Sequence, residues 1–137
     1  MAKPTSIYLT QNDCDRLSDL LEAYATGSGG RRFDALENEL ARAIVVHASK
    51  IPKDVVTMNS RVVFEDETTG EQREVTLVYP TQADIGAGKI SILVPVGSAL
   101  LGLRVGQSID WELPSGQRRR YRVIAVPYQP EAAGKPG

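Results

Sequence analysis

The sequence predicts an α+β protein in which an antiparallel helical hairpin precedes a compact, largely antiparallel sheet domain. Two observations lead to this prediction. Apolar residues recur every three or four positions over the first 50 residues, which is typical of amphipathic helices. From Val55 onward they occur in short β-type runs separated by polar turns, which is typical of strands. We expect the hairpin over residues 1–52, the sheet domain over 53–128 and a flexible tail over 129–137.

The first helix is expected over residues 11–25. Thr10 followed by Asp13 is a helix-start pattern. A threonine side chain accepts a first-turn backbone N–H, and a carboxylate three positions later accepts the backbone N–H of the threonine. An apolar stripe follows at helical spacing. Its members are Cys14, which we expect to pack in the core, Leu17, Leu20 or Leu21, and Tyr24.

The second helix is expected over residues 31–48, after a glycine-rich break at 27–30. Glycine accepts positive φ, so this break suits a short loop between two antiparallel helices. His47 is the only histidine, and its place on the apolar stripe predicts a packed structural role. The stripe consists of Phe33, Leu36, Leu40, Ile44 and His47. At ~1.5 Å per residue, each arm would be roughly 22 to 27 Å long.

The sheet domain is expected to begin with a hairpin whose strands cover 62–64 and 75–79. Further strands are expected at 90–94, 109–113 and 120–126, with one helical turn at 98–102. Trp111 would lie in the core on the same face as Ile109 and Leu113. The arginines at 118–120 and 122 suggest either a basic strand face or ordinary alternation, and we favour alternation, with Tyr121 and Val123 inward.

Composition excludes several classes of protein. The chain has 137 residues, 24% of them charged, and a formal net charge of -1, so it has no global field to attract nucleic acid. A single cysteine excludes an intramolecular disulfide and a zinc site built on several thiolates. No apolar run approaches the ~18 residues of a membrane span, and no secretory signal follows the N-terminus. We therefore expect a cytoplasmic protein without a cofactor or a membrane partner.

Several blocks of sequence carry a family resemblance. The run at 83–92, with Pro95, the segment 98–102 and Val105-Gly106, resembles the C-terminal domain of Gre factors, which is similar in fold to FK506-binding proteins. Other blocks, at Pro52, 54–60, 77–80, 95–102 and 128–131, resemble the regulator of nucleoside diphosphate kinase family. This second resemblance covers nearly the whole chain.

The resemblance implies a protein whose C-terminal domain docks on RNA polymerase near the secondary channel, with the hairpin directed toward that channel. The implied contact segment would lie exposed at the start of a helical turn. Its residues are Pro95, Val96, Gly97, Ser98 and Leu100. Many Gre factors carry an acidic residue two positions before this proline, where the chain has Leu93.

The hairpin tip argues against transcript cleavage. Gre factors use acidic tip residues to help hold Mg²⁺, which prefers carboxylate oxygens. Here the tip contains Gly29, Gly30, Arg31 and Arg32 and offers no carboxylate, while Glu22 and Asp34 lie about a turn back on the two arms. The arginines either contact acidic side chains or phosphates, or form a solvated loop end. We expect no catalytic residue and no metal site.

The leading hypothesis is thus a non-enzymatic regulator at the secondary-channel entrance of RNA polymerase, competing with Gre factors and reading no specific DNA sequence. Two alternatives stay open. The first is an adaptor that binds nucleoside diphosphate kinase directly. The second is a peptidyl-prolyl isomerase-like enzyme, which would need an aromatic-lined pocket that two phenylalanines and one tryptophan supply thinly.

Overall fold

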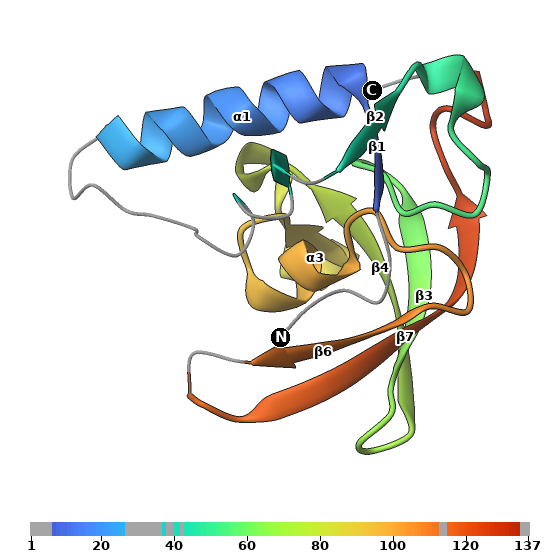
Figure 1. The fold of residues 1–137 in the computed structure, drawn as a ribbon. Helices are drawn as coiled ribbons and strands as arrows, with labels where there is room; N and C mark the ends of the chain where they lie inside the picture. The colour runs from blue at the N-terminus through green and yellow to red at the C-terminus, as the bar shows by residue number, and fades with distance from the viewer. Residues whose placement is uncertain (1–6, 27–36, 38–39, 42, 113–114, 135–137) are drawn as a thin grey trace.

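The computed structural model describes residues 7–26, 37, 40–41, 43–112 and 115–134 (Figure 1). Seven strands, two α-helices and three short 3-10 helices lie wholly in this part of the chain. In order they are β1 (Tyr8–Thr10), α1 (Gln11–Thr26), β2 (Ile44–Val46), the 3-10 helix η1 (Ala48–Lys50), β3 (Arg61–Asp66), β4 (Glu71–Val78), the 3-10 helices η2 (Pro80–Gln82) and η3 (Ile85–Ala87), β5 (Lys89–Ser91), α3 (Pro95–Leu100), β6 (Ser108–Glu112) and β7 (Arg118–Tyr128).

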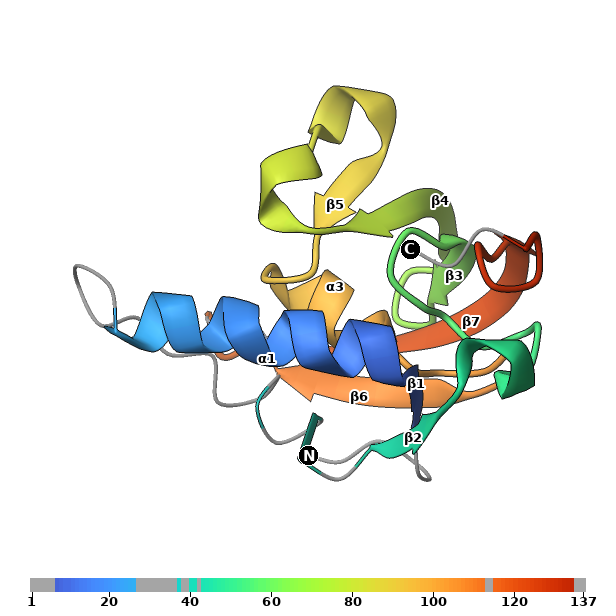
Figure 2. The ribbon, with the colours of Figure 1, turned by 90° about the horizontal axis from the view of Figure 1, so that it is seen from above.

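Helix α1 begins where the sequence predicts. The backbone N–H of Asp13 donates to Thr10 Oγ1 at 3.1 Å, which supplies the expected cap. Leu17 and Leu21 are buried on the predicted stripe, while Cys14 is only partly buried. In both ribbon views α1 lies across one side of the sheet domain (Figures 1 and 2). The helix is therefore packed on the domain along much of its length.

The predicted second helix ends earlier than expected. Backbone at Glu37, Leu40 and Ala41 is helical, but residues 44–46 form β2, which pairs in parallel with β1. The prediction of a helix to residue 48 is wrong. Ile44, Val45 and Val46 are consecutive β-branched residues, which favour a strand once a partner strand is available.

His47 also differs from the prediction. It is exposed and lies just beyond β2, where its Nδ1 accepts the backbone N–H of Ser49 at 3.2 Å. The expected packed role of His47 is therefore wrong, because the stripe to which it was assigned stops before it. The imidazole caps η1 instead.

The C-terminal domain is a five-stranded sheet in the order β5-β4-β3-β7-β6. All neighbouring strands are antiparallel except β4 and β5, which are parallel. The predicted first hairpin is confirmed as β3 and β4, joined by a turn in which Gly70 has φ of 78°. Helix α3 covers one face of the sheet, and the connection from β4 to β5 forms a lobe at one end of the domain (Figure 2).

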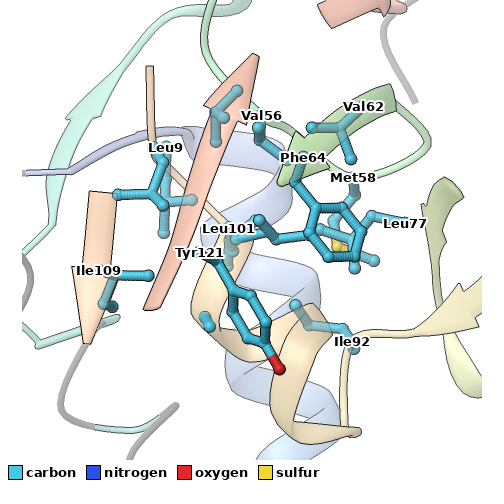
Figure 3. Close-up of a cluster of buried hydrophobic side chains, with 14 of the residues drawn as sticks. Leu9, Val56, Met58, Val62, Phe64, Leu77, Ile92, Leu101, Ile109 and Tyr121 are labelled. Carbon is cyan, nitrogen blue, oxygen red and sulfur yellow. The ribbon is translucent and has the colours of Figure 1, made fainter. Parts of the chain in front are cut away.

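One hydrophobic core joins the N-terminal segment to the sheet. Leu9, Leu17 and Leu21 belong to the same buried cluster as residues of the sheet and α3. Figure 3 shows ten labelled members of this cluster converging between the strands and α3. The predicted domain boundary at residue 52 stays a prediction. The hydrophobic core contains residues from both sides of this boundary. No helix in the described ranges is long and apolar enough to cross a membrane.

The segment after β7 is fixed to the domain. Gln129 is 3% exposed, and its side-chain amide donates to the carbonyl oxygens of Pro52 and Val55, both at 2.8 Å. Glu131 Oε1 accepts the Thr57 hydroxyl at 2.8 Å. The predicted flexible tail is therefore wrong for residues 129–134, because polar side chains there satisfy buried partners. Residues 135–137 lie outside the described part of the chain.

Candidate protein-binding surface

Helix α3 sits tightly on the end of β5. A Cβ added at Gly97 would lie 2.4 Å from the carbonyl oxygen of Ser91 and 3.1 Å from a methyl carbon of Leu77. Only glycine permits this approach without a shift of the backbone. The Ser98 hydroxyl also donates to the carbonyl oxygen of Ile92 at 2.7 Å. These contacts hold α3 at a fixed height above the sheet.

The predicted contact segment is only partly accessible. Gly97, Ser98 and Leu100 are buried, so the expectation that they lie exposed is corrected by the structure. These residues lie on the side of α3 that faces the core. The close approach of Gly97 to the Ser91 carbonyl and the Ser98 hydrogen bond hold this side against the sheet. Val96 is half-buried and Val94 is 38% exposed. The accessible apolar surface at the start of α3 is thus formed by Val94 and Val96, while the side chain of Pro95 lies outside the described part.

A cavity of about 240 Å³ lies beside α3, on the same face of the sheet. Phe64 from β3 and Tyr121 from β7 contribute its aromatic rings, whose centroids are 5.5 Å apart in an edge-to-face arrangement with an angle of 78°. Val96 provides the wall on the α3 side. Both rings are labelled in Figure 3, where they belong to the core cluster. The small number of aromatic residues did not predict this cavity, because the pairing of β3 with β7 is what brings Phe64 and Tyr121 together.

Two ion pairs line the cavity. Arg119 donates to Asp66 Oδ2 at 3.2 Å, and Arg73 donates to Glu71 Oε1 at 2.8 Å. Asp66 Oδ1 also accepts the backbone N–H of Thr68 at 2.9 Å. Two carboxylates and two guanidinium groups cancel, so the cavity carries no net charge. Burial raises the pKa of the Tyr121 phenol, and the nearby Asp66 carboxylate raises it further.

The base of α1 holds a buried carboxylate that sequence reasoning assigned to capping alone. Asp13 is 1% exposed, and its Oδ2 accepts the backbone N–H of Met58 at 3.1 Å. Burial raises the pKa of Asp13 to about 6, and the Glu131 carboxylate adds to this rise. The hydrogen bond from Met58 and the charge of Arg16 act in the opposite direction. Asp13 therefore connects α1 to the turn before β3.

Arg16 strengthens the same junction. Its guanidinium carbon lies 4.2 Å from the centroid of the Tyr79 ring, in cation–π geometry. Tyr79 itself is 7% exposed and follows β4. Two successive turns of α1 thus contact the sheet domain through Asp13 and Arg16. The helical spacing of these two residues was visible in the sequence, but their partners were not.

Strand β7 carries the arginine-rich run that the sequence singled out. Alternation on β7 is confirmed, with Tyr121 and Val123 buried and Arg120 and Arg122 exposed. Arg120 pairs with Glu67 and Asp110 at 3.3 and 2.9 Å. The predicted tip residues Gly29, Gly30, Arg31 and Arg32, together with Asp34 and the Trp111 side chain, lie outside the described part of the chain, whereas Glu22 is exposed on α1.

Comparison with protein families resolves the identity of both segments. Residues 51–128 match the model "Transcription elongation factor, GreA/GreB, C-term", and residues 5–46 match the model "Rnk N-terminus". The chain is 48% identical over 136 residues to the regulator of nucleoside diphosphate kinase of Escherichia coli strain K12, covering 98% of this chain and 97% of that protein. The chain belongs to the regulator of nucleoside diphosphate kinase family. This family is related to the Gre transcription elongation factors.

More distant relatives support the relation to Gre factors. The chain is 38% identical over 98 residues to transcription elongation factor GreA of Thermodesulfovibrio yellowstonii, covering 72% of this chain and 61% of that protein. A solved structure described as a GreA/GreB transcription elongation factor from Nitrosomonas europaea is similar, with a TM-score of 0.70 and 50% identity. The similarity covers 90% of this chain and 99% of that one. The α+β fold predicted from the sequence, with a Gre-type C-terminal domain, is therefore confirmed.

Proposed function

We propose that this regulator binds RNA polymerase at the entrance of the secondary channel, in the cytoplasm, and modulates transcription without cleaving the transcript. The observation that carries the proposal is the match of residues 51–128 to the Gre C-terminal domain. That domain presents an accessible apolar surface at Val94 and Val96, at the start of the segment that resembles the polymerase-directed loop of Gre factors. Docking of an apolar contact here would remove exposed valine from water.

The absence of cleavage is proposed from the tip sequence. Residues 25–32 contain two arginines and no carboxylate, whereas Mg²⁺-assisted hydrolysis needs carboxylate ligands. A protein that occupies the channel entrance without these ligands competes with Gre factors and lowers their access to the polymerase. Its effect on transcription would then depend on the factor it displaces.

Binding of the purified protein to core RNA polymerase tests the proposal, with GreA as a competitor. Val94→Asp is the informative variant, because it places a charge on the accessible surface beside α3. Val105→Asp is a matched control, since Val105 is 41% exposed and lies outside α3. We expect mutually exclusive binding with GreA, and we expect Val94→Asp but not Val105→Asp to weaken it.

Three further results test the contact at the tip, the lack of cleavage and the binding to polymerase itself. Weaker binding by the Arg31→Ala, Arg32→Ala double variant would assign a contact to the tip. Shortening of RNA in a backtracked complex, lost on Glu22→Ala or Asp34→Ala, would overturn the proposed lack of cleavage. If no complex with the core enzyme formed at micromolar concentrations, the polymerase proposal would be abandoned.

A second candidate follows from the relative that is 48% identical and named as a regulator of nucleoside diphosphate kinase. Direct contact with that kinase would explain such a name, and so would control of its expression. Retention of purified kinase on the immobilised protein separates the two meanings. Retention would favour an adaptor, and its absence alongside polymerase binding would favour an effect through transcription.

A further inference from the structure

The cavity beside α3 has the features of a binding site for part of a protein. Its volume of about 240 Å³ is below the roughly 300–1,000 Å³ of pockets that hold small molecules and cofactors. The rings of Phe64 and Tyr121 and the side chain of Val96 offer apolar and aromatic surface. A space of this size suits one or two side chains of a partner better than a whole ligand.

The charges around the cavity select the kind of side chain. Asp66 and Arg119 already neutralise each other at 3.2 Å, and Glu71 and Arg73 do so at 2.8 Å. The cavity therefore holds no unpaired charge that would attract a charged side chain or a phosphate, and such a group would compete with the partly buried Asp66–Arg119 pair. An uncharged apolar group would leave both pairs intact. The guanidinium of Arg119 has five N–H groups, so it can also donate to a peptide carbonyl while it holds Asp66.

The walls of the cavity are held in place. Asp66 is fixed by its hydrogen bond from the Thr68 backbone, and β3 and β7 are paired along the cavity floor. On the other side, the close approach of Gly97 to the Ser91 carbonyl prevents α3 from moving nearer to the sheet. The space is consequently formed before any partner arrives, which reduces the ordering needed on binding.

We propose that this cavity is a socket for one uncharged, apolar side chain, of the size of leucine or proline, carried on a short segment of a partner protein. Phe64, Tyr121 and Val96 contact the side chain, and Arg119 donates to a carbonyl oxygen of the segment. The socket goes beyond the proposed polymerase binding, because it specifies what is recognised and does not require that the partner be RNA polymerase.

Blocked tripeptides test the socket without any polymerase. The probes are acetyl-Ala-Leu-Ala-amide and acetyl-Ala-Pro-Ala-amide, with the glutamate and lysine versions as charged counterparts. Chemical shifts of the ¹⁵N-labelled full chain are followed as each peptide is added up to about 10 mM, since one apolar anchor supports affinities in the millimolar range. We expect saturable shifts at the amides of Phe64, Tyr121 and Val96 with leucine or proline, and none with glutamate or lysine.

Neighbouring arginines on β7 provide a matched pair of variants. Arg119→Gln removes an ion pair that lines the cavity, whereas Arg120→Gln removes ion pairs with Glu67 and Asp110 that do not line it. We expect Arg119→Gln to weaken peptide binding by about tenfold or more and Arg120→Gln to leave it unchanged. Equal effects of the two variants would overturn the role of Arg119, and would point to a general change in the sheet.

Val96→Asp tests the apolar wall, and its folding is checked by the same amide spectrum. Loss of the leucine-induced shifts with an otherwise preserved spectrum supports the socket. Shifts confined to residues away from the cavity, or equal responses to leucine and glutamate peptides, overturn it. If the peptides bind but Arg119→Gln still binds core polymerase normally, the socket stands and serves another partner. If the peptides do not bind but core RNA polymerase does, the socket proposal is wrong and the proposed polymerase binding stands.

Discussion

The buried carboxylate of Asp13 should make the stability of the protein depend on pH in an unusual direction. Its pKa is raised from 3.8 to about 6 in the folded chain. A raised pKa means that the folded state holds this proton more tightly than the unfolded state. The stabilisation is therefore fully present below about pH 4 and is lost as the pH rises through about 6. Most paired carboxylates have the opposite effect.

The size of the effect follows from the two pKa values. A difference of about two pH units at 1.36 kcal/mol each gives about 3 kcal/mol of unfolding free energy from Asp13 alone. Other groups contribute to the total, so the contribution of Asp13 is isolated by comparison with Asp13→Asn. Asparagine is nearly the same size and keeps an oxygen that can accept the Met58 N–H, but it does not ionise.

Urea unfolding of both proteins at several pH values between 4 and 8 is the assay. We expect the wild type to lose about 2.5 kcal/mol relative to Asp13→Asn between pH 4 and pH 7.5. Asp15→Asn is the control, because Asp15 is an exposed carboxylate on the same helix, where it accepts the exposed Gln11 amide at 2.8 Å. Parallel stability curves for the wild type and Asp13→Asn would refute the reasoning.

Three other substitutions test the packing of the fold. Gly97→Ala should destabilise the protein by about 2 kcal/mol in urea unfolding, because its Cβ would lie 2.4 Å from the Ser91 carbonyl oxygen. Gly86→Ala is the control, since its Cβ would make an ordinary contact of 3.4 Å. Equal urea midpoints for the two variants would contradict the expectation. Gln129→Leu should cost about 1–3 kcal/mol by leaving the buried Val55 carbonyl without its donor, and a wild-type melting temperature would show that water replaces the lost amide. Thr10→Ala should cost about 1 kcal/mol through loss of the helix cap, and unchanged helical circular dichroism and stability would exclude it.

Local patterns predicted the parts of the fold that local chemistry decides. The cap at Thr10 and the burial of Leu17 and Leu21 follow from spacing within one helix. The β3–β4 hairpin follows from two β-type runs and a polar turn ending in Gly70. The Gre-type architecture was indicated by sequence blocks that lie mostly outside these elements, before β3 and between the end of β4 and the end of α3.

Tertiary partners account for what the sequence did not reveal. Ile44 to Val46 fit a helical stripe as well as a strand, and only pairing with β1 decides between them. Asp13 satisfied a capping pattern, so nothing in its spacing signalled the contact with Met58, which is 45 residues away. The polar composition after β7 suggested a tail, because composition does not show that Gln129 reaches the carbonyls of Pro52 and Val55. The cavity depended on the pairing of β3 with β7, which brings Phe64 and Tyr121 together.

The position of β7 has a consequence for how the protein is made. Although it is the last strand in the described part of the chain, β7 lies inside the sheet, between β3 and β6. During synthesis, β3 and β4 can form their hairpin early, but β6 has no neighbour in the sheet until β7 has left the ribosome. A nascent chain therefore exposes one side of β3 and an unpaired β6 until β7 has emerged. A ribosome that stalls before that point would hold a chain in which two strand edges are open to pairing with other chains.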